Sequence, residues 1–149
     1  MTESNTILLS GLGVIAGGLI AIQSVLNSSL GQRLGNLGSV LVLTFVSIAV
    51  LILLILIFPS TSNLSKLPGI SEWYLYVGGA LGVAILAAPI FLVPRIGATS
   101  TLLAMVLGQS LFALAIDHFG LFAAPKIELS LARLIGVLLV TVGAFLVGR

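Results

Sequence analysis

Apolar residues dominate the chain in five long stretches, and polar residues are concentrated in the short segments between these stretches. A helix needs about 20 mainly apolar residues to cross the hydrocarbon core of a bilayer, and each stretch has about this length. The pattern therefore predicts five membrane-spanning helices. The predicted helices cover residues 7–27, 40–58, 73–93, 98–116 and 131–148.

The segments between the predicted helices differ in character. Residues 59–71 are rich in Ser, Thr and Asn, which is typical of a solvated loop. Residues 94–97 leave room only for a tight turn, so we expect the third and fourth helices to form an antiparallel hairpin. Residues 119–129 mix apolar and charged side chains, which suits a segment at the membrane interface.

The composition favours a membrane protein over several other classes. Hydrophobic residues make up 59% of the 149-residue chain and charged residues 7%, and a soluble domain of this size could not bury so much apolar surface. Because the chain has no Cys, one histidine and four acidic residues, we expect neither a metal site nor another cofactor. The six Lys and Arg residues are scattered and form no patch for nucleic acid. We therefore predict an all-α polytopic membrane protein with a single transmembrane domain.

Polar side chains inside the predicted helices are the best candidates for a substrate site, because polar groups are costly in hydrocarbon. Gln23 and Asn27 lie four residues apart and share one face of the first helix. Gln109 lies near the middle of the fourth helix, and Thr44 and Ser47 share a face of the second. These side chains could replace the hydration of a small polar solute. The alternative is that they form hydrogen bonds between helices and only stabilise the bundle.

Asp117 and His118 are adjacent at the end of the predicted fourth helix. A carboxylate beside an imidazole can relay protons near neutral pH, which is one interpretation of this pair. Adjacent helical residues point about 100° apart, so the other interpretation is a cap and turn at the level of the lipid headgroups.

Arg33 and Arg95 each follow a predicted helix and lie on the same side of the membrane. Either guanidinium could attract an anionic substrate, or both could simply reach lipid phosphates. Pro89 removes a backbone hydrogen bond inside the third helix and should kink it. The kink would be either a fixed feature or a gating hinge.

Charged residues are missing from the centres of all five predicted helices, and so is histidine. A proton-coupled cation exporter of the small multidrug resistance type depends on a carboxylate at mid-membrane, so we do not expect this kind of coupling. A polar site without charge favours an uncharged or zwitterionic solute. The chain also has no nucleophile elbow, phosphate loop or nucleotide fingerprint, and we predict that it is not an enzyme.

Short motifs follow one another in a recognisable order along nearly the whole chain. They are Ala21-Ile22-Gln23, Asn27-Ser28-Ser29-Leu30-Gly31, Glu72-Trp73, Gly78-Gly79-Ala80-Leu81-Gly82, Val93-Pro94-Arg95-Ile96-Gly97-Ala98, Gly108-Gln109, Asp117-His118-Phe119-Gly120, and Arg133 with Gly136 and Gly143. Together they resemble the YdcZ-type family of the drug/metabolite transporter (DMT) superfamily. The resemblance implies a five-helix protein of the bacterial inner membrane, equivalent to half of a ten-helix transporter with inverted repeats. It does not name a substrate.

Lysine and arginine residues are evenly divided between the two membrane sides when the loops are assigned alternately. Lys66, Lys126 and Arg133 lie on one side, and Arg33, Arg95 and Arg149 lie on the other. The bias of Lys and Arg between the short loops of the two sides sets the orientation of a membrane protein. Equal numbers of these residues, three on each side, therefore predict insertion in both orientations. Two opposed copies would reproduce inverted halves, so we predict an antiparallel homodimer, with a paralogous five-helix subunit as the alternative partner.

The function that we expect is secondary transport of a small polar metabolite or organic solute, by alternating access in a dimer embedded in the bilayer. The alternative is a non-transporting membrane subunit that stabilises or regulates a partner protein. A passive pore would need a continuous polar stripe on one helix, and the second helix has almost no polar residues.

Overall fold

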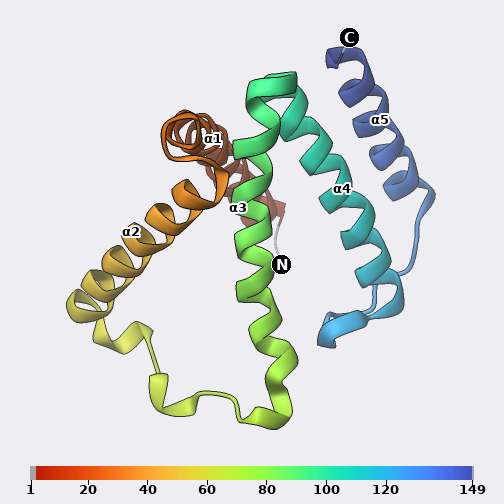
Figure 1. The fold of residues 1–149 in the computed structure, drawn as a ribbon. Helices are drawn as coiled ribbons and strands as arrows, with labels where there is room; N and C mark the ends of the chain where they lie inside the picture. Colours follow the sequence, from red (N-terminus) through yellow and green to blue (C-terminus); the bar gives the residue numbers. More distant parts are fainter. Residues whose placement is uncertain (1–2, 149) are drawn as a thin grey trace. The chain divides into compact units, whose positions relative to one another are not determined.

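The structure is a computed structural model that describes residues 3–148 (Figure 1). Its α-helices are α1 (Glu3–Leu34), α2 (Asn36–Ile57), α3 (Val77–Ile96), α4 (Ala98–Phe119) and α5 (Leu131–Val147). Short 3-10 helices cover Pro59–Thr61, Leu64–Lys66, Ile70–Tyr76 and Leu121–Ala123. No strand occurs between residues 3 and 148, so the predicted all-α class is confirmed.

Among the described residues, four segments are both long enough and apolar enough to span a membrane. They are Ile7–Leu34, Asn36–Ile57, Ile70–Ile96 and Ala98–Phe119. The apolar helix α5 has 17 residues. At 1.5 Å per residue it is about 26 Å long, slightly shorter than a hydrocarbon core of about 30 Å. Large apolar side chains along all these helices are exposed, as expected for an all-α membrane protein of about five helices.

The helices differ from the apolar stretches mainly at their ends. α1 continues to Leu34 and α2 begins at Asn36, so the polar residues between the first two stretches are also helical. Hydropathy marks the part of a helix that fits the hydrocarbon, whereas the helix itself can continue into the headgroup region. On entry to the third span the aromatic residues form the 3-10 helix Ile70–Tyr76, and α3 begins only at Val77.

Two prolines lie inside α3. Pro89 is buried, and the helix continues past it without a break. Pro94, at which the apolar pattern ends, is followed by two further helical residues. A proline ring holds φ near its helical value, so the chain can stay helical beyond it for a few residues. α3 ends instead at Gly97, where φ is 79°.

The chain divides into two compact units, and the single transmembrane domain stays a prediction. The first unit ends at Phe91 and the second begins at Leu92, within α3. In the first unit α1 packs against α2, and in the second unit α4 packs against α5 (Figure 1). The core of each unit is therefore an interface between neighbouring helices.

A matching one-residue turn follows α1 and α3. Gly35 has φ 75° and ψ 163°, and Gly97 has φ 79° and ψ 162°. In each case an arginine stands two residues before the glycine, and a hydroxyl residue, Ser39 or Thr101, stands four residues after it. Both hydroxyl side chains are fully buried and donate to a carbonyl at or next to the turn glycine, Ser39 to Asn36 at 2.8 Å and Thr101 to Gly97 at 2.7 Å. The chain thus uses one helix–glycine–helix motif twice.

Candidate functional site

A row of small polar residues on α1 is buried in the first unit. Ser24, Asn27, Ser28 and Gly31 have the spacing that places residues on one face of a helix. The exposed fractions of Ser24, Asn27 and Ser28 are 2%, 5% and 1%, and Gly31 is also buried. We call these four residues the α1 polar stripe.

Within the described chain, two members of the α1 polar stripe lack a hydrogen-bond partner. The Ser24 hydroxyl donates to the Ile20 carbonyl at 2.7 Å, but the Ser28 hydroxyl and the Asn27 side-chain amide bond to none of the described residues. Leaving a buried polar group unpaired costs about 1–3 kcal/mol. The amide and the hydroxyl each contain both a donor and an acceptor. The stripe can therefore bind polar groups of a solute without contributing a charge.

Gly31, at the end of the stripe, is in close contact with α3. A Cβ atom added to Gly31 would overlap the Ile90 side chain and would lie 3.5 Å from the Ser39 hydroxyl of α2. Ile90 and Ser39 are themselves buried. Three helices of the first unit thus meet at Gly31, and the absence of a side chain there lets them approach closely.

The other polar residues predicted for the first two helices are less buried than Asn27. Gln23 is exposed on α1, Thr44 is half-buried on α2, and Ser47 is exposed on α2. The Thr44 and Ser47 hydroxyls donate to carbonyls one turn earlier in the same helix, Val40 at 2.8 Å and Leu43 at 2.9 Å. Hydroxyl side chains in helices commonly bond in this way, and these two therefore need no further partner.

Gln109, the candidate from the fourth helix, belongs to the second unit and is exposed on α4. Arg33 is exposed in the last turn of α1, and Arg95 is exposed in the last turn of α3. A positive charge in the last turn of a helix interacts favourably with the helix dipole. Among the side chains predicted for a polar substrate site, Asn27 is the buried one.

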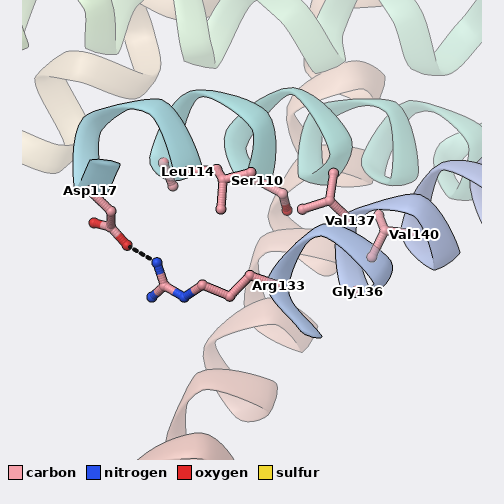
Figure 2. Close-up of a pocket in the computed structure, with 8 residues that line it drawn as sticks. Ser110, Leu114, Asp117, Arg133, Gly136, Val137 and Val140 are labelled. Carbon is pink, nitrogen blue, oxygen red and sulfur yellow. Dashed lines mark hydrogen bonds and ion pairs between the residues drawn. The ribbon is translucent and has the colours of Figure 1, made fainter. Parts of the chain in front are cut away.

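The second unit contains an ion pair that joins α4 to α5. Asp117 Oδ2, in the last turn of α4, lies 3.0 Å from Arg133 Nη1, in the first turn of α5 (Figure 2). The Asp117 side chain is 30% exposed and that of Arg133 is 36% exposed. The pair lies at one end of a groove between the two helices. The groove has a volume of about 390 Å³ and continues past Leu114 and Gly136.

Local interactions position both charged residues. The Ser130 hydroxyl caps α5 by accepting from the Arg133 backbone N–H at 3.3 Å, and Gly120 ends α4 with φ 63°. The Ile127 N–H donates to the Asp117 carbonyl at 2.8 Å, so the connecting segment folds back onto α4. A guanidinium in the first turn of a helix opposes the helix dipole, and a nearby carboxylate offsets this cost. The position of Arg133 in the first turn of a helix is the signal in the sequence from which an acidic partner could have been predicted.

His118 lies away from the ion pair. Its ring packs edge to face against Phe119, with 4.9 Å between the ring centres, and lines a separate hollow with Leu111 and Leu129. Its Nδ1 atom is buried and has no hydrogen-bond partner among the described residues. In the structure Asp117 is therefore paired with Arg133, and the relay between Asp117 and His118 stays a prediction.

The groups that the two sites offer are suited to binding. The α1 polar stripe supplies an amide and a hydroxyl, and the ion pair supplies a carboxylate and a guanidinium. Among the described residues, no three His, Asp or Glu side chains lie close enough together to hold a metal ion.

Comparison with known proteins identifies the family. Residues 8–146 match the family described as "Putative inner membrane exporter, YdcZ", so the match covers the α1 polar stripe and the ion pair. No curated protein and no solved structure matches the chain. The apolar helices of membrane-spanning length fit a location in the inner membrane. The chain therefore belongs to this YdcZ family, the family that its sequence motifs resemble.

Proposed function

We propose that the chain transports a small uncharged or zwitterionic solute and binds it at the α1 polar stripe. The observation that carries this proposal is the buried Ser28 hydroxyl without a partner, beside the buried residue Asn27, whose amide bonds to none of the described residues. A solute that hydrogen-bonds to both groups removes the cost of leaving them unpaired. Membership of a family of exporters supports transport. Because the stripe contains no charged side chain, a solute with a net charge would lose its hydration without compensation.

Exposed glycines support a dimer as the working assembly. A Cβ atom added to Gly13 or Gly17 of α1, or to Gly78 or Gly82 of α3, would meet nothing within 4 Å. Small residues on an open helix face let a second helix approach closely in the membrane. In our proposal a second copy covers these faces, and alternating access in the resulting ten-helix assembly opens the site to each side in turn.

The balance of positive charge supports an antiparallel arrangement of the two copies. Orientation depends on Lys and Arg and only weakly on acidic residues, so the ion pair with Asp117 leaves Arg133 in the count. If Arg133 is omitted because it lies within α5, Lys66 and Lys126 remain on one side against three arginines on the other. Of these three, Arg149 lies outside the described residues. Either count leaves only a weak orientation signal.

A non-transporting subunit remains the alternative function. In such a protein the polar residues of the helices would serve to join neighbouring helices, and Asn27 should then bond to another helix. Its amide bonds to none of the described residues, which favours a binding role.

The test is a thermal-shift screen of the detergent-purified full chain against uncharged, zwitterionic and charged metabolites. A solute present at 100 times its Kd stabilises the folded state by about 2.7 kcal/mol. We expect uncharged or zwitterionic solutes to raise the Tm, and we expect Asn27→Ala and Ser28→Ala to abolish this rise. Ser29→Ala is the matched control, because the Ser29 side chain is exposed and its hydroxyl bonds to the Val25 carbonyl.

Uptake of the same solute into proteoliposomes then separates transport from binding alone. Transport that is lost in Asn27→Ala and kept in Ser29→Ala would support the proposal. An unchanged Tm response in both Asn27→Ala and Ser28→Ala would reduce the α1 polar stripe to a packing surface.

A further inference from the structure

The groove between α4 and α5 is a second candidate binding site, independent of the α1 polar stripe. We propose that it binds a membrane phospholipid whose headgroup carries a phosphate and a primary ammonium, as in phosphatidylethanolamine. The headgroup binds at the Asp117–Arg133 pair and the start of an acyl chain lies in the groove. This inference concerns the lipid around the protein and does not depend on the proposed transport function.

The ion pair leaves hydrogen-bonding groups available to a headgroup. Its one hydrogen bond joins Arg133 Nη1 to Asp117 Oδ2. The second carboxylate oxygen, Oδ1, and the remaining guanidinium donors, Nε and Nη2, bond to none of the described residues. A guanidinium binds phosphate oxygens through parallel hydrogen bonds, and a carboxylate oxygen accepts from an ammonium group. One zwitterionic headgroup can therefore satisfy both free groups while the protein's own pair stays intact.

The groove leads from this pair along both helices. Ser110 stands seven residues before Asp117, and Val140 stands seven residues after Arg133, which corresponds to roughly 10 Å along each helix. Between these ends the groove is lined by apolar side chains and Gly136 (Figure 2). Charged residues at the ends of membrane helices lie at the level of the headgroups. The groove thus offers a lipid a charged contact at the membrane surface and an open apolar surface below it.

Charge complementarity selects the kind of lipid. The pair has no net charge, which matches a zwitterionic headgroup better than an anionic one. A choline headgroup is also zwitterionic, but its ammonium has no N–H with which to donate to Asp117. An apolar helix of a second copy would cover Asp117 Oδ1 and the free guanidinium donors without pairing them, which is costly. We therefore assign the groove to lipid.

Native mass spectrometry of the detergent-purified full chain tests the proposal. The protein is titrated with phosphatidylethanolamine, phosphatidylcholine or phosphatidylglycerol of identical acyl composition, and we expect the ethanolamine lipid to bind most tightly. Asp117→Asn should weaken ethanolamine binding about two- to fivefold, the size of one partly exposed ion pair, without weakening binding of the glycerol lipid. Arg133→Gln should weaken binding of all three lipids. Lys66→Gln, in the loop after α2, is the control for the general loss of a positive charge and should change none of these affinities.

A second pair of variants tests the groove without altering any charge. A Cβ atom added to either Gly136 or Gly143 of α5 would meet nothing within 4 Å, but only Gly136 lines this groove. We expect Gly136→Leu to fill the groove and lower lipid binding, and Gly143→Leu to leave it unchanged. Equal lipid binding by the two variants would overturn the proposal, and so would an unaltered lipid preference in Asp117→Asn. Loss of dimer instead of lipid in Gly136→Leu would also overturn it, because the occupant would then be a second copy.

Discussion

Single buried residues determine how closely the helices of the first unit approach. Gly31 lies where α1, α2 and α3 meet, and a side chain at this position would overlap Ile90. Asn27 and Ser28 lie on the same face of α1, each about one turn before Gly31. On this one face of α1, Gly31 provides the close packing, and Asn27 and Ser28 provide the polar groups. Each property can therefore be altered by mutation without changing the other.

We predict that Gly31→Ala destabilises the protein by about 1–3 kcal/mol, because a methyl group forced into a packed contact displaces its neighbours. The measurement is thermal unfolding in detergent. Gly11→Ala is the control, since an added Cβ there meets nothing within 4 Å and Gly11 is not part of the proposed dimer face. In an Ile90→Ala background the cost of Gly31→Ala should largely disappear. A cost that stays the same in both backgrounds would show that the contact with Ile90 is not its cause.

We also predict that transport does not depend on titration of Asp117. A coupling carboxylate has to exchange its proton with the solute, whereas Asp117 lies in the last turn of α4 and is bonded to Arg133. Solute uptake by proteoliposomes, measured between about pH 5 and 8, should have the same pH profile in the wild type and in Asp117→Asn. A strong pH dependence that vanishes in this variant would instead favour the proton relay with His118.

Among the elements, the repeated helix–glycine–helix motif has a clear physical basis. At Gly35 and Gly97 the backbone lies in a region of positive φ with ψ near 160°, which is essentially restricted to glycine. In both motifs the hydroxyl residue of the following helix donates to a backbone carbonyl at the turn glycine or at the residue after it. The same turn can therefore connect two different pairs of apolar helices.

We predict that Gly35→Ala and Gly97→Ala each destabilise the protein by about 1–3 kcal/mol, the cost of holding a side-chain-bearing residue in this region. Thermal unfolding is again the measurement. Gly79→Ala is the helical control and should be neutral or slightly stabilising, because alanine favours helix over glycine and an added Cβ has free space there. Equal effects at all three positions would contradict the importance of the turn geometry.

For the whole molecule, the distribution of charge governs how the chain inserts. With the loops assigned alternately, the sequence predicts that positive residues are balanced across the two sides of the membrane, and the apolar helices themselves carry no orientation signal. The helix faces that carry Gly13 and Gly17 on α1, and Gly78 and Gly82 on α3, have free space beside these glycines, so a second copy could pack against them. These two properties together favour two copies in opposite orientations.

We predict that C-terminal fusions to a reporter active in the cytoplasm and to a reporter active outside it are both functional. Because the bias is so weak, one lysine added near either terminus should shift the ratio of the two activities strongly. The two reporter activities, normalised to protein level, provide the measurement. A single fixed orientation, unchanged by the added lysine and accompanied by a parallel dimer, would rule out the antiparallel arrangement.

The sequence by itself determined the class of protein, the all-α fold and the family. The bilayer acts as solvent along each helix, so its demands appear as local runs of apolar residues, and the motifs of the family lie within these runs or at their ends. The polar candidates could also be found locally, because a polar residue in an apolar run is conspicuous at any position. Asn27 was among them, together with residues that turn out to be exposed.

Only the tertiary structure decided which candidates are buried and which residues meet. Gln23 and Asn27 are four residues apart on α1, yet their burial differs because the neighbouring helices cover only one narrow face. Asp117 and Arg133 are separated by 16 residues, and Gly31 contacts Ile90 from another helix. Such pairs depend on the rotation and crossing of packed helices. Hydropathy cannot specify this packing, because lipid and protein neighbours favour the same apolar side chains.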